Sequence, residues 1–458
     1  MQRDQSLDAL RGFAILTMVL SGSIAFGGVL PAWMYHAQVP PPVHQFNPTI
    51  PGITWVDLVF PFFLFSMGAA IPLSLQKLEG ENKAWSSVFT IAGKRFLLLV
   101  FFAYFTQHMK AWVLSSSPAA GDYLLSIAAF VLLFFQFYEY KGITYKKFFR
   151  IIKTAAFGIA IILLAVLPFS DGTGFDTKRV DIIILVLANM ALFGTLIWWV
   201  TRNHPLWRMA VLPVVMAIFL SGKEAGWQKL VYEFSPLPWL YKFYYLKYLF
   251  IIIPGTFAGE WLLAKGKAES TEPATLNSVV ALLSALLVIS NTAFLFGRYL
   301  TVNFISSIII CSLLFILLRK HSGSVWNKFL QAGTYLLLLG LSFEAYEGGV
   351  KKDSSTYSYY FITSGLAFFM LLFFGALQNL PVVRNGTHFL SRNGRNPMVA
   401  YTVGNLLLLP LLQLTGGIEW LNNLNTGFVS GLLRGILFTG AVSLLTIFFV
   451  RRRWFWKT

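Results

Sequence analysis

Long apolar stretches recur along the whole chain and are separated by short polar segments. Each is about as long as the roughly 20 apolar residues that a helix needs to cross a bilayer. Two stretches are short, so the pattern predicts about 12 to 14 spanning helices in an all-α polytopic membrane protein, with residues 1–458 as one membrane domain. The predicted spans are 9–30, 54–76, 88–108, 122–138, 149–168, 182–200, 208–221, 244–263, 275–296, 300–318, 328–345, 358–378, 398–415 and 430–450.

The composition supports a membrane location. Hydrophobic residues make up 56% of the chain and charged residues only 12%, whereas a soluble protein carries roughly 25% charged residues. The mean hydropathy is +0.66. Such a chain cannot cover itself with polar side chains, so most of its outer surface is expected to face lipid. The one cysteine, Cys311, excludes a disulfide framework and a cysteine-based metal site.

The distribution of basic residues predicts the orientation. A net charge of +17 would suggest nucleic acid in a soluble protein, but here it fits basic loops that stay in the cytoplasm. With a cytoplasmic N-terminus and one crossing per span, cytoplasmic segments hold 25 lysines and arginines and outer segments hold 10. Both termini are therefore predicted to be cytoplasmic, and no nucleic-acid partner is expected.

Three segments outside the spans have distinctive compositions. The predicted outer segment 31–53 is rich in proline, which stiffens a loop. The predicted outer segment 222–243 carries tryptophans and tyrosines, which suit an interfacial helix or a platform for a sugar ring. The basic and aromatic tail 451–457 favours an anchor to anionic lipid.

Ionisable groups in or beside a span are costly, so they are candidates for function. On the predicted outer side, His36 and His44 lie in segment 31–53, and Asp57 opens the next span. Histidine titrates near neutral pH and suits general-base work, and a neighbouring carboxylate would orient it. The alternatives are solvated loop histidines or half of a metal site. Because no cysteine or glutamate cluster lies nearby, we expect no metal.

On the predicted cytoplasmic side, Asp8 and Arg11 are three residues apart and share a helix face. They form an anchoring ion pair, or Asp8 fixes Arg11 to hold a phosphate. Arg392, Arg395 and Asn396 precede the predicted span 398–415. They form an anion site helped by the positive end of that helix, or an ordinary basic loop with Asn396 as helix cap.

Several segments together resemble a known family. Residues 6–13 read SLDALRGF, His36 is followed by Ala37, residues 52–68 read GITWVDLVFPFFLFSMG, and residues 94–99 read KRFLLL. This order resembles heparan-α-glucosaminide N-acetyltransferase and its bacterial relatives, within the wider transmembrane acyltransferase group. The similarity is fainter at 254–259 and 390–415, and it covers about a third of the chain in all.

The resemblance implies an enzyme of the bacterial inner membrane. It would move acetyl from cytoplasmic acetyl-CoA to an amino or hydroxyl group of a sugar or oligosaccharide on the periplasmic side. His36 matches the catalytic histidine of the family, because alanine follows it and the G-x-T-x-x-D pattern comes next. The additional residues 39–51 leave His44 as an alternative. Catalysis would be by a general base or through an acetyl-histidine intermediate.

The donor is polyanionic, so its phosphates are expected among cytoplasmic polar and basic residues. The candidates are Arg11, Lys94, Arg95, Arg392, Arg395 and Asn396. Membrane lipid, and a second copy in a homodimer, are further expected partners. The other function class is a secondary transporter or a lipid-linked sugar flippase. Such proteins usually show repeats and broken helices at mid-membrane, whereas here we see no repeat and the ionisable residues cluster at the two faces.

Overall fold

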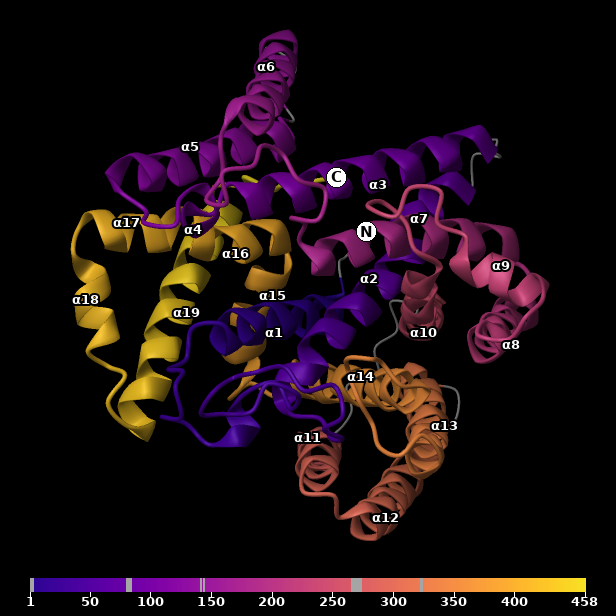
Figure 1. Cartoon of the computed structure of the whole chain (residues 1–458). Coiled ribbons are helices and arrows are strands. Elements are labelled where there is room, and N and C mark those ends of the chain that lie inside the picture. Colours follow the sequence, from indigo (N-terminus) through magenta and orange to yellow (C-terminus); the bar gives the residue numbers. More distant parts are fainter. Residues whose placement is uncertain (1–3, 80–84, 141, 143–144, 265–273, 322–323) are drawn as a thin grey trace.

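The fold is a bundle of helices, shown in Figure 1. The computed structural model describes residues 4–79, 85–140, 142, 145–264, 274–321 and 324–458. Within these ranges no β-strand occurs, apart from one isolated bridge between Tyr138 and Trp456, which confirms the all-α prediction. The helices are α1 Gln5–Ser21, η1 Ala32–Met34, α2 Trp55–Glu79, α3 Trp85–His108, α4 Ala111–Leu114, α5 Ala120–Phe137, α6 Lys146–Val166, α7 Ile182–Thr201, α8 Pro205–Ser221, α9 Trp227–Glu233, η2 Phe243–Tyr248, α10 Leu249–Ala264, α11 Ala274–Phe296, α12 Leu300–Leu318, η3 Arg319–His321, α13 Val325–Tyr346, α14 Tyr357–Leu377, α15 Arg384–Gly394, α16 Pro397–Val403, η4 Gly404–Leu408, α17 Leu409–Leu414, α18 Gly417–Asn422 and α19 Phe428–Arg451.

Eleven helices in the described part of the chain are long and apolar enough to cross a membrane, so the protein is a helical integral membrane protein. The three other predicted spans are also helical and form α1, α8 and α13. α1 and α8 have 17 residues each. α13 has 22 residues, but Asn327, Lys328 and Glu344 dilute its apolar character.

Two predicted spans differ from the helices that form. The predicted span 9–30 ends early, because α1 stops at Ser21. Gly27 and Gly28 follow with φ angles of 82° and 84°, a left-handed conformation that glycine adopts freely and that is incompatible with a continuing helix. The predicted span 398–415 is divided into α16, a π-helical turn at Gly404–Leu408, and α17.

The helices divide into a buried centre and a periphery. In α14, 89% of the most apolar window is buried inside the protein, whereas in α6 only 17% is buried. Figure 1 shows α6 projecting from the bundle, while α1, α2 and α14 lie near its middle. Most apolar side chains on α6 are not covered by other parts of the protein, which fits the expectation that the outer surface faces lipid.

The predicted outer segments 31–53 and 222–243 both lie outside the long helices. The first contains only the short turn η1. The second contains the seven-residue helix α9, on which Trp227 is 62% exposed. A short helix with an exposed tryptophan fits the interfacial interpretation.

α1 packs against α15 at a distance that only glycine permits. A Cβ atom on Gly12 would lie 1.9 Å from the carbonyl oxygen of Leu390, and one on Gly394 would lie 1.9 Å from the carbonyl oxygen of Asp8. The guanidinium of Arg11 also donates to the carbonyl of Gly394 at 3.5 Å. The SLDALRGF segment and the segment around Arg392–Asn396 therefore lie in direct contact.

The predicted outer and cytoplasmic candidate residues lie in different parts of the bundle. The side chain of Asn396 donates to the carbonyl of Trp454 at 2.9 Å, so the last residues lie at the same end as the start of α1. His36 follows the other end of α1, and a helix of this length spans about 25 Å at 1.5 Å per residue. Arg11 lies ten residues before that end, or about 15 Å along the helix axis, so the two groups lie at different levels of the bundle.

The orientation is testable by cysteine labelling in intact cells. Val43, in segment 31–53, is 76% exposed, and Val382, in a predicted cytoplasmic segment, is 93% exposed. We expect Val43→Cys to react with an impermeant maleimide, and Val382→Cys to react only after permeabilisation. The native Cys311 is buried, so the background is expected to be low. The reverse pattern would place His36 in the cytoplasm and contradict the orientation.

Candidate functional site

The outer site is built where the loop before α2 meets the first turn of that helix. Asp57 accepts the backbone N–H of Thr54 at 2.9 Å and its hydroxyl at 3.3 Å, in the manner of a capping box. The N–H of Ala37 also donates to the same oxygen, at 3.2 Å. The hydroxyl of Thr54 in turn donates to the carbonyl of Tyr35 at 2.7 Å. These bonds fix residues 35–37 against the start of α2.

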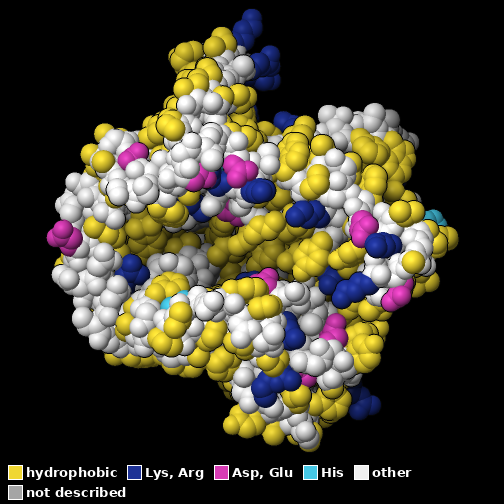
Figure 2. Space-filling view, in the orientation of Figure 1, with side chains coloured by type: hydrophobic (Ala, Val, Ile, Leu, Met, Phe, Trp, Pro, Cys, Tyr) yellow, Lys and Arg dark blue, Asp and Glu magenta, His cyan; other side chains and the backbone are white. Residues whose placement is uncertain are grey.

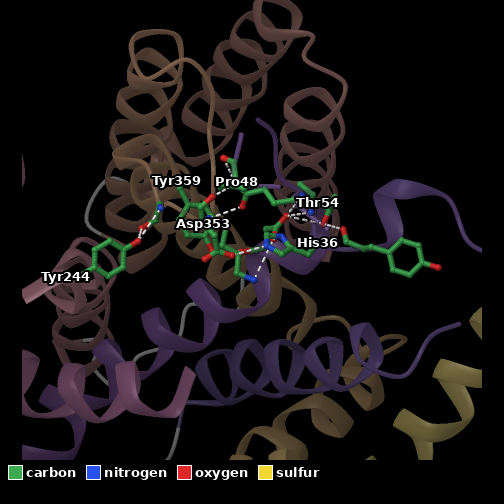
Figure 3. Close-up of polar contacts among 12 residues, drawn as sticks. His36, Pro48, Thr54, Tyr244, Asp353 and Tyr359 are labelled. Carbon is green, nitrogen blue, oxygen red and sulfur yellow. Dashed lines mark hydrogen bonds and ion pairs between the residues drawn. The ribbon is translucent and has the colours of Figure 1, made fainter. Parts of the chain in front are cut away.

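This arrangement places His36 between two carboxylates (Figure 3). Its Nδ1 lies 2.5 Å from Oδ1 of Asp57, and its Nε2 lies 3.0 Å from Oδ2 of Asp353. The side chain of Asp57 is fully buried, whereas that of Asp353 is 46% exposed. The buried carboxylate contacts one ring nitrogen, and the more exposed carboxylate contacts the other.

Two further groups contact Asp57. The ammonium of Lys352 lies 3.7 Å from Oδ1 of its carboxylate, and the hydroxyl of Tyr359 on α14 donates to its backbone carbonyl at 2.8 Å. Lys352 is a partner of the buried charge, which would be very costly to bury without such partners, whereas Tyr359 holds the backbone.

The segment between α13 and α14 supplies Lys352 and Asp353, two site residues that were not predicted from the sequence. Gln38 joins the two loops, since its amide donates to the carbonyl of Asp353 and its Oε1 accepts the N–H of Asp353 at 2.9 Å. The sequence carries only a weak signal for these two residues, namely an aspartate that follows two lysines in a predicted outer segment.

The surroundings of His36 change its pKa in opposing directions. Burial alone lowers the pKa of the imidazole, but the hydrogen bonds to Asp353 and Asp57 outweigh it, and the net pKa is raised above the ordinary 6.5. The positive charge of Lys352 opposes this rise. A histidine with a raised pKa and an oriented ring is suited to accept a proton near neutral pH.

The structure does not bring His44 into this cluster. Its Nε2 accepts the N–H of Gly27 at 3.1 Å, and its Nδ1 lies 3.3 Å from the carbonyl of Val39. Its ring packs edge-on against Phe26 and Tyr35. His44 thus holds the loop together, and both of its ring nitrogens are occupied. Among the described residues, no three histidine, cysteine or acidic side chains are arranged to hold a metal.

A cavity of about 340 Å³ lies among α1, α2, α3, α7 and α16. Figure 2 shows a hollow at the centre of the face that it presents, with hydrophobic side chains on its floor. Arg11 and Arg95 line the cavity, and Phe63 and Met18 contribute apolar walls. Phe63 is six residues after Asp57 on α2, or about 9 Å along the helix axis. The cavity is therefore mainly apolar with a few basic residues, and it extends from the level of Phe63 towards the end of the bundle opposite His36.

The guanidinium groups of the cavity are held by neighbouring polar atoms. Arg11 donates to Asp8 at 3.2 Å and to the carbonyl of Ser66 at 3.2 Å. Arg95 donates to the hydroxyl of Ser74, which also lines the cavity, at 3.4 Å. Side chains fixed in this way bind an anion with less loss of conformational entropy.

The other four candidates for the donor lie outside the cavity lining. Lys94 and Arg392 are exposed. Arg395 is also exposed, and its guanidinium lies over the ring of Phe455, 5.6 Å from the centroid. Asn396 is buried and uses its amide to bond the backbone of Trp454 and Trp456. The structure thus brings only Arg11 and Arg95 of the six together at the cavity.

Comparison with known proteins gives one family assignment. The family described as a domain of unknown function, DUF5009, matches residues 3–262. No curated protein sequence matches the chain. The matched region contains α1, the loop of His36 and all of α2 and α3, and it makes up more than half of the chain. The protein therefore belongs to the DUF5009 family.

Proposed function

We propose that the protein is a transmembrane acetyltransferase of the bacterial inner membrane. It would take acetyl from cytoplasmic acetyl-CoA and place it on an amino or hydroxyl group of a periplasmic sugar. The observation that carries this proposal is the pair of His36 and the buried Asp57, with Nδ1 and Oδ1 2.5 Å apart. The resemblance of the SLDALRGF and DLVFP segments to acyltransferases supports it.

The proposed reaction assigns each group a task. Asp57 holds Nδ1, so Nε2 is the nitrogen that takes the proton from the acceptor. Asp353 is 46% exposed and gives way to the acceptor at that nitrogen. The acceptor nitrogen or oxygen forms a bond to the acetyl carbon, the thioester carbon–sulfur bond breaks, and the thiolate of CoA leaves and is protonated. The alternative order, through acetyl-histidine, uses the same nitrogen as the nucleophile.

The donor is placed in the cavity on the other side of the bundle. Its volume of about 340 Å³ falls within the roughly 300–1,000 Å³ of ligand pockets. The apolar walls suit a slender acyl-carrying arm, and Arg11 and Arg95 suit anionic groups. We place the acetyl end towards Phe63, the lining residue on α2 nearest to Asp57 in sequence.

The test is acetyl transfer by protein purified in detergent. Acetyl-CoA and a panel of amino sugars and neutral sugars would be supplied, and free CoA followed with a thiol reagent. Cys311 is buried and contributes little to the signal. Sugar-dependent release of CoA, with acetylated sugar identified by mass spectrometry, supports the proposal. A transporter or flippase would bind or move a sugar without cleaving the thioester, and that result would overturn it.

The pH dependence of transfer is expected to follow His36. A general base works when unprotonated, so kcat/KM should rise with pH through a midpoint above 6.5, because the pKa of His36 is raised. Asp353→Asn removes a cause of the rise and should move the midpoint to lower pH. Lys352→Met removes a charge that lowers the pKa and should move it to higher pH. Midpoints that stay together in all three proteins would exclude His36 as the titrating group.

The donor side is tested by two neighbouring basic residues. Arg95 lines the cavity, whereas Lys94 is exposed and does not. We expect Arg95→Ala to weaken CoA binding about 10-fold or more, since a charge-assisted hydrogen bond contributes roughly 1.5–3 kcal/mol. Lys94→Ala should bind CoA as the parent does. Calorimetric titration with CoA measures both, and equal losses would place the donor elsewhere.

A further inference from the structure

The chain does not end in a free basic tail. α19 ends at Arg451, and Arg453 has a φ of 60° that reverses the chain direction. The N–H of Trp454 then bonds back to the carbonyl of Phe449 at 2.9 Å. Residues 451–453 are exposed and suit the predicted contact with anionic lipid. Residues 454–458 fold back onto the protein, and we call them the C-terminal strap.

The strap is held at three points. Asn396 bonds its backbone twice, donating to the carbonyl of Trp454 at 2.9 Å and accepting the N–H of Trp456 at 3.2 Å. The N–H of Lys457 donates to the carbonyl of Phe137 at 2.9 Å. The ring of Trp456 is 5% exposed and packs against Phe130 and Phe137. The strap is thus an ordered part of the fold, fixed to α5 and to the start of α16.

The strap forms part of the cavity wall. Trp456, Lys457 and Thr458 line the same cavity as Arg11 and Arg95. Three basic residues therefore belong to the lining of a cavity whose other walls are mainly apolar. Like charges repel, so the positive charges of these residues are stabilised by neighbouring carboxylates or by a bound anion. Lys457 has one such neighbour, since its Nζ lies 2.5 Å from Oε2 of Glu139.

The pair of Lys457 and Glu139 is suited to exchange its partner. Both side chains are about half exposed, at 54% and 49%, and exposed ion pairs contribute little to stability. We propose that the C-terminal strap is part of the donor site, and that Lys457 leaves Glu139 to bind the anionic phosphates of the donor. This inference rests on the proposed function, which supplies a polyanionic donor for this cavity.

The opposing interpretation is a structural one, in which the pair only staples the strap to the end of α5. Two variants separate the interpretations, because each breaks the same pair from one side. Lys457→Ala removes the proposed ligand of the phosphates, whereas Glu139→Gln keeps that ligand and neutralises the carboxylate with which it pairs. Arg451→Ala is the matched control, since it removes a basic residue of the same tail that does not line the cavity. Lys457→Arg keeps the charge.

The experiment is calorimetric titration of the full-length variants with CoA and with pantetheine, which lacks the phosphates. We expect Lys457→Ala to weaken CoA binding about 10-fold and to leave pantetheine binding unchanged. Glu139→Gln should bind CoA as tightly as the parent or more tightly, and Lys457→Arg and Arg451→Ala should resemble the parent.

The possible failures are distinct. If the parent binds CoA and transfers acetyl, but Lys457→Ala and Glu139→Gln lose affinity equally or not at all, the strap is structural and the inference is wrong while the proposed function stands. If the parent binds no CoA, the proposed donor and the role of the strap are both overturned. Thermal unfolding of each variant shows whether a loss of affinity reflects a loss of fold.

Discussion

Replacing His36 with alanine is expected to lower acetyl transfer by about 10²–10⁴-fold, the usual contribution of a general base. The variant loses the ring that lies between Asp57 and Asp353 but leaves the cavity lining untouched. CoA binding should therefore stay at the parental value. Turnover with acetyl-CoA and an active sugar, measured beside CoA titration, separates the two effects.

His44→Ala is the matched control for this prediction. Both histidines lie in segment 31–53, but His44 bonds only to Gly27 and Val39 within its own loop region. We expect His44→Ala to alter mainly the affinity for the acceptor and to retain turnover. An inactive His44→Ala beside an active His36→Ala would exchange the two roles and would show that the resemblance is wrongly aligned across residues 39–51.

Adding a single methyl group at Gly12 is expected to destabilise the whole bundle. The new Cβ would lie 1.9 Å from the carbonyl oxygen of Leu390 and 2.9 Å from the nitrogen of Gly394. These are backbone atoms, so no side chain can turn away and α1 must separate from α15. Overpacking a tight contact typically costs about 1–3 kcal/mol, and we expect Gly12→Ala to reach the upper part of this range.

The control is a second glycine that lies away from this contact. Gly386 is on α15, and a Cβ atom there would have no heavy atom within 4 Å. Gly386→Ala should keep or slightly raise stability, because alanine is favoured over glycine in a helix by roughly 0.5–1 kcal/mol. Thermal unfolding in detergent compares the two variants with the parent. Equal melting temperatures for Gly12→Ala and Gly386→Ala would mean that α1 and α15 are not in close contact.

The helices could be predicted because lipid imposes a simple rule. A spanning segment must satisfy its own backbone hydrogen bonds and present apolar side chains, so length and hydropathy locate it. The rule says little about where a helix stops within an apolar run. The predicted first span therefore continues to residue 30, although α1 ends at Ser21 and Gly27 and Gly28 adopt a left-handed conformation. It also gave no sign of the π-helical turn at Gly404–Leu408.

The candidate site was predictable only where its residues are close in sequence. His36 and Asp57 belong to one loop and the helix that follows it, so their contact was expected from local order. Asp353 contacts His36 from a residue 317 positions away, and no periodic pattern reports such a pairing. The position of Lys457 at the cavity was likewise not predictable, because it depends on a reversal of the chain direction at Arg453. Composition alone predicts a lipid anchor for this basic tail and gives no information about the reversal.

The contact of Gly12 with α15 also affects how the protein is made. α1 leaves the ribosome well before its partner α15, which begins at Arg384, beyond the family-matched residues 3–262. At about 5–20 residues per second, translation of the intervening chain takes roughly 20–70 s. During this interval Gly12 of α1 has not yet packed against α15, and His36 has not yet contacted Asp353. The amino-terminal half is therefore expected to be a target for membrane proteases when it is synthesised alone, and to survive when the remaining chain is supplied as a separate polypeptide.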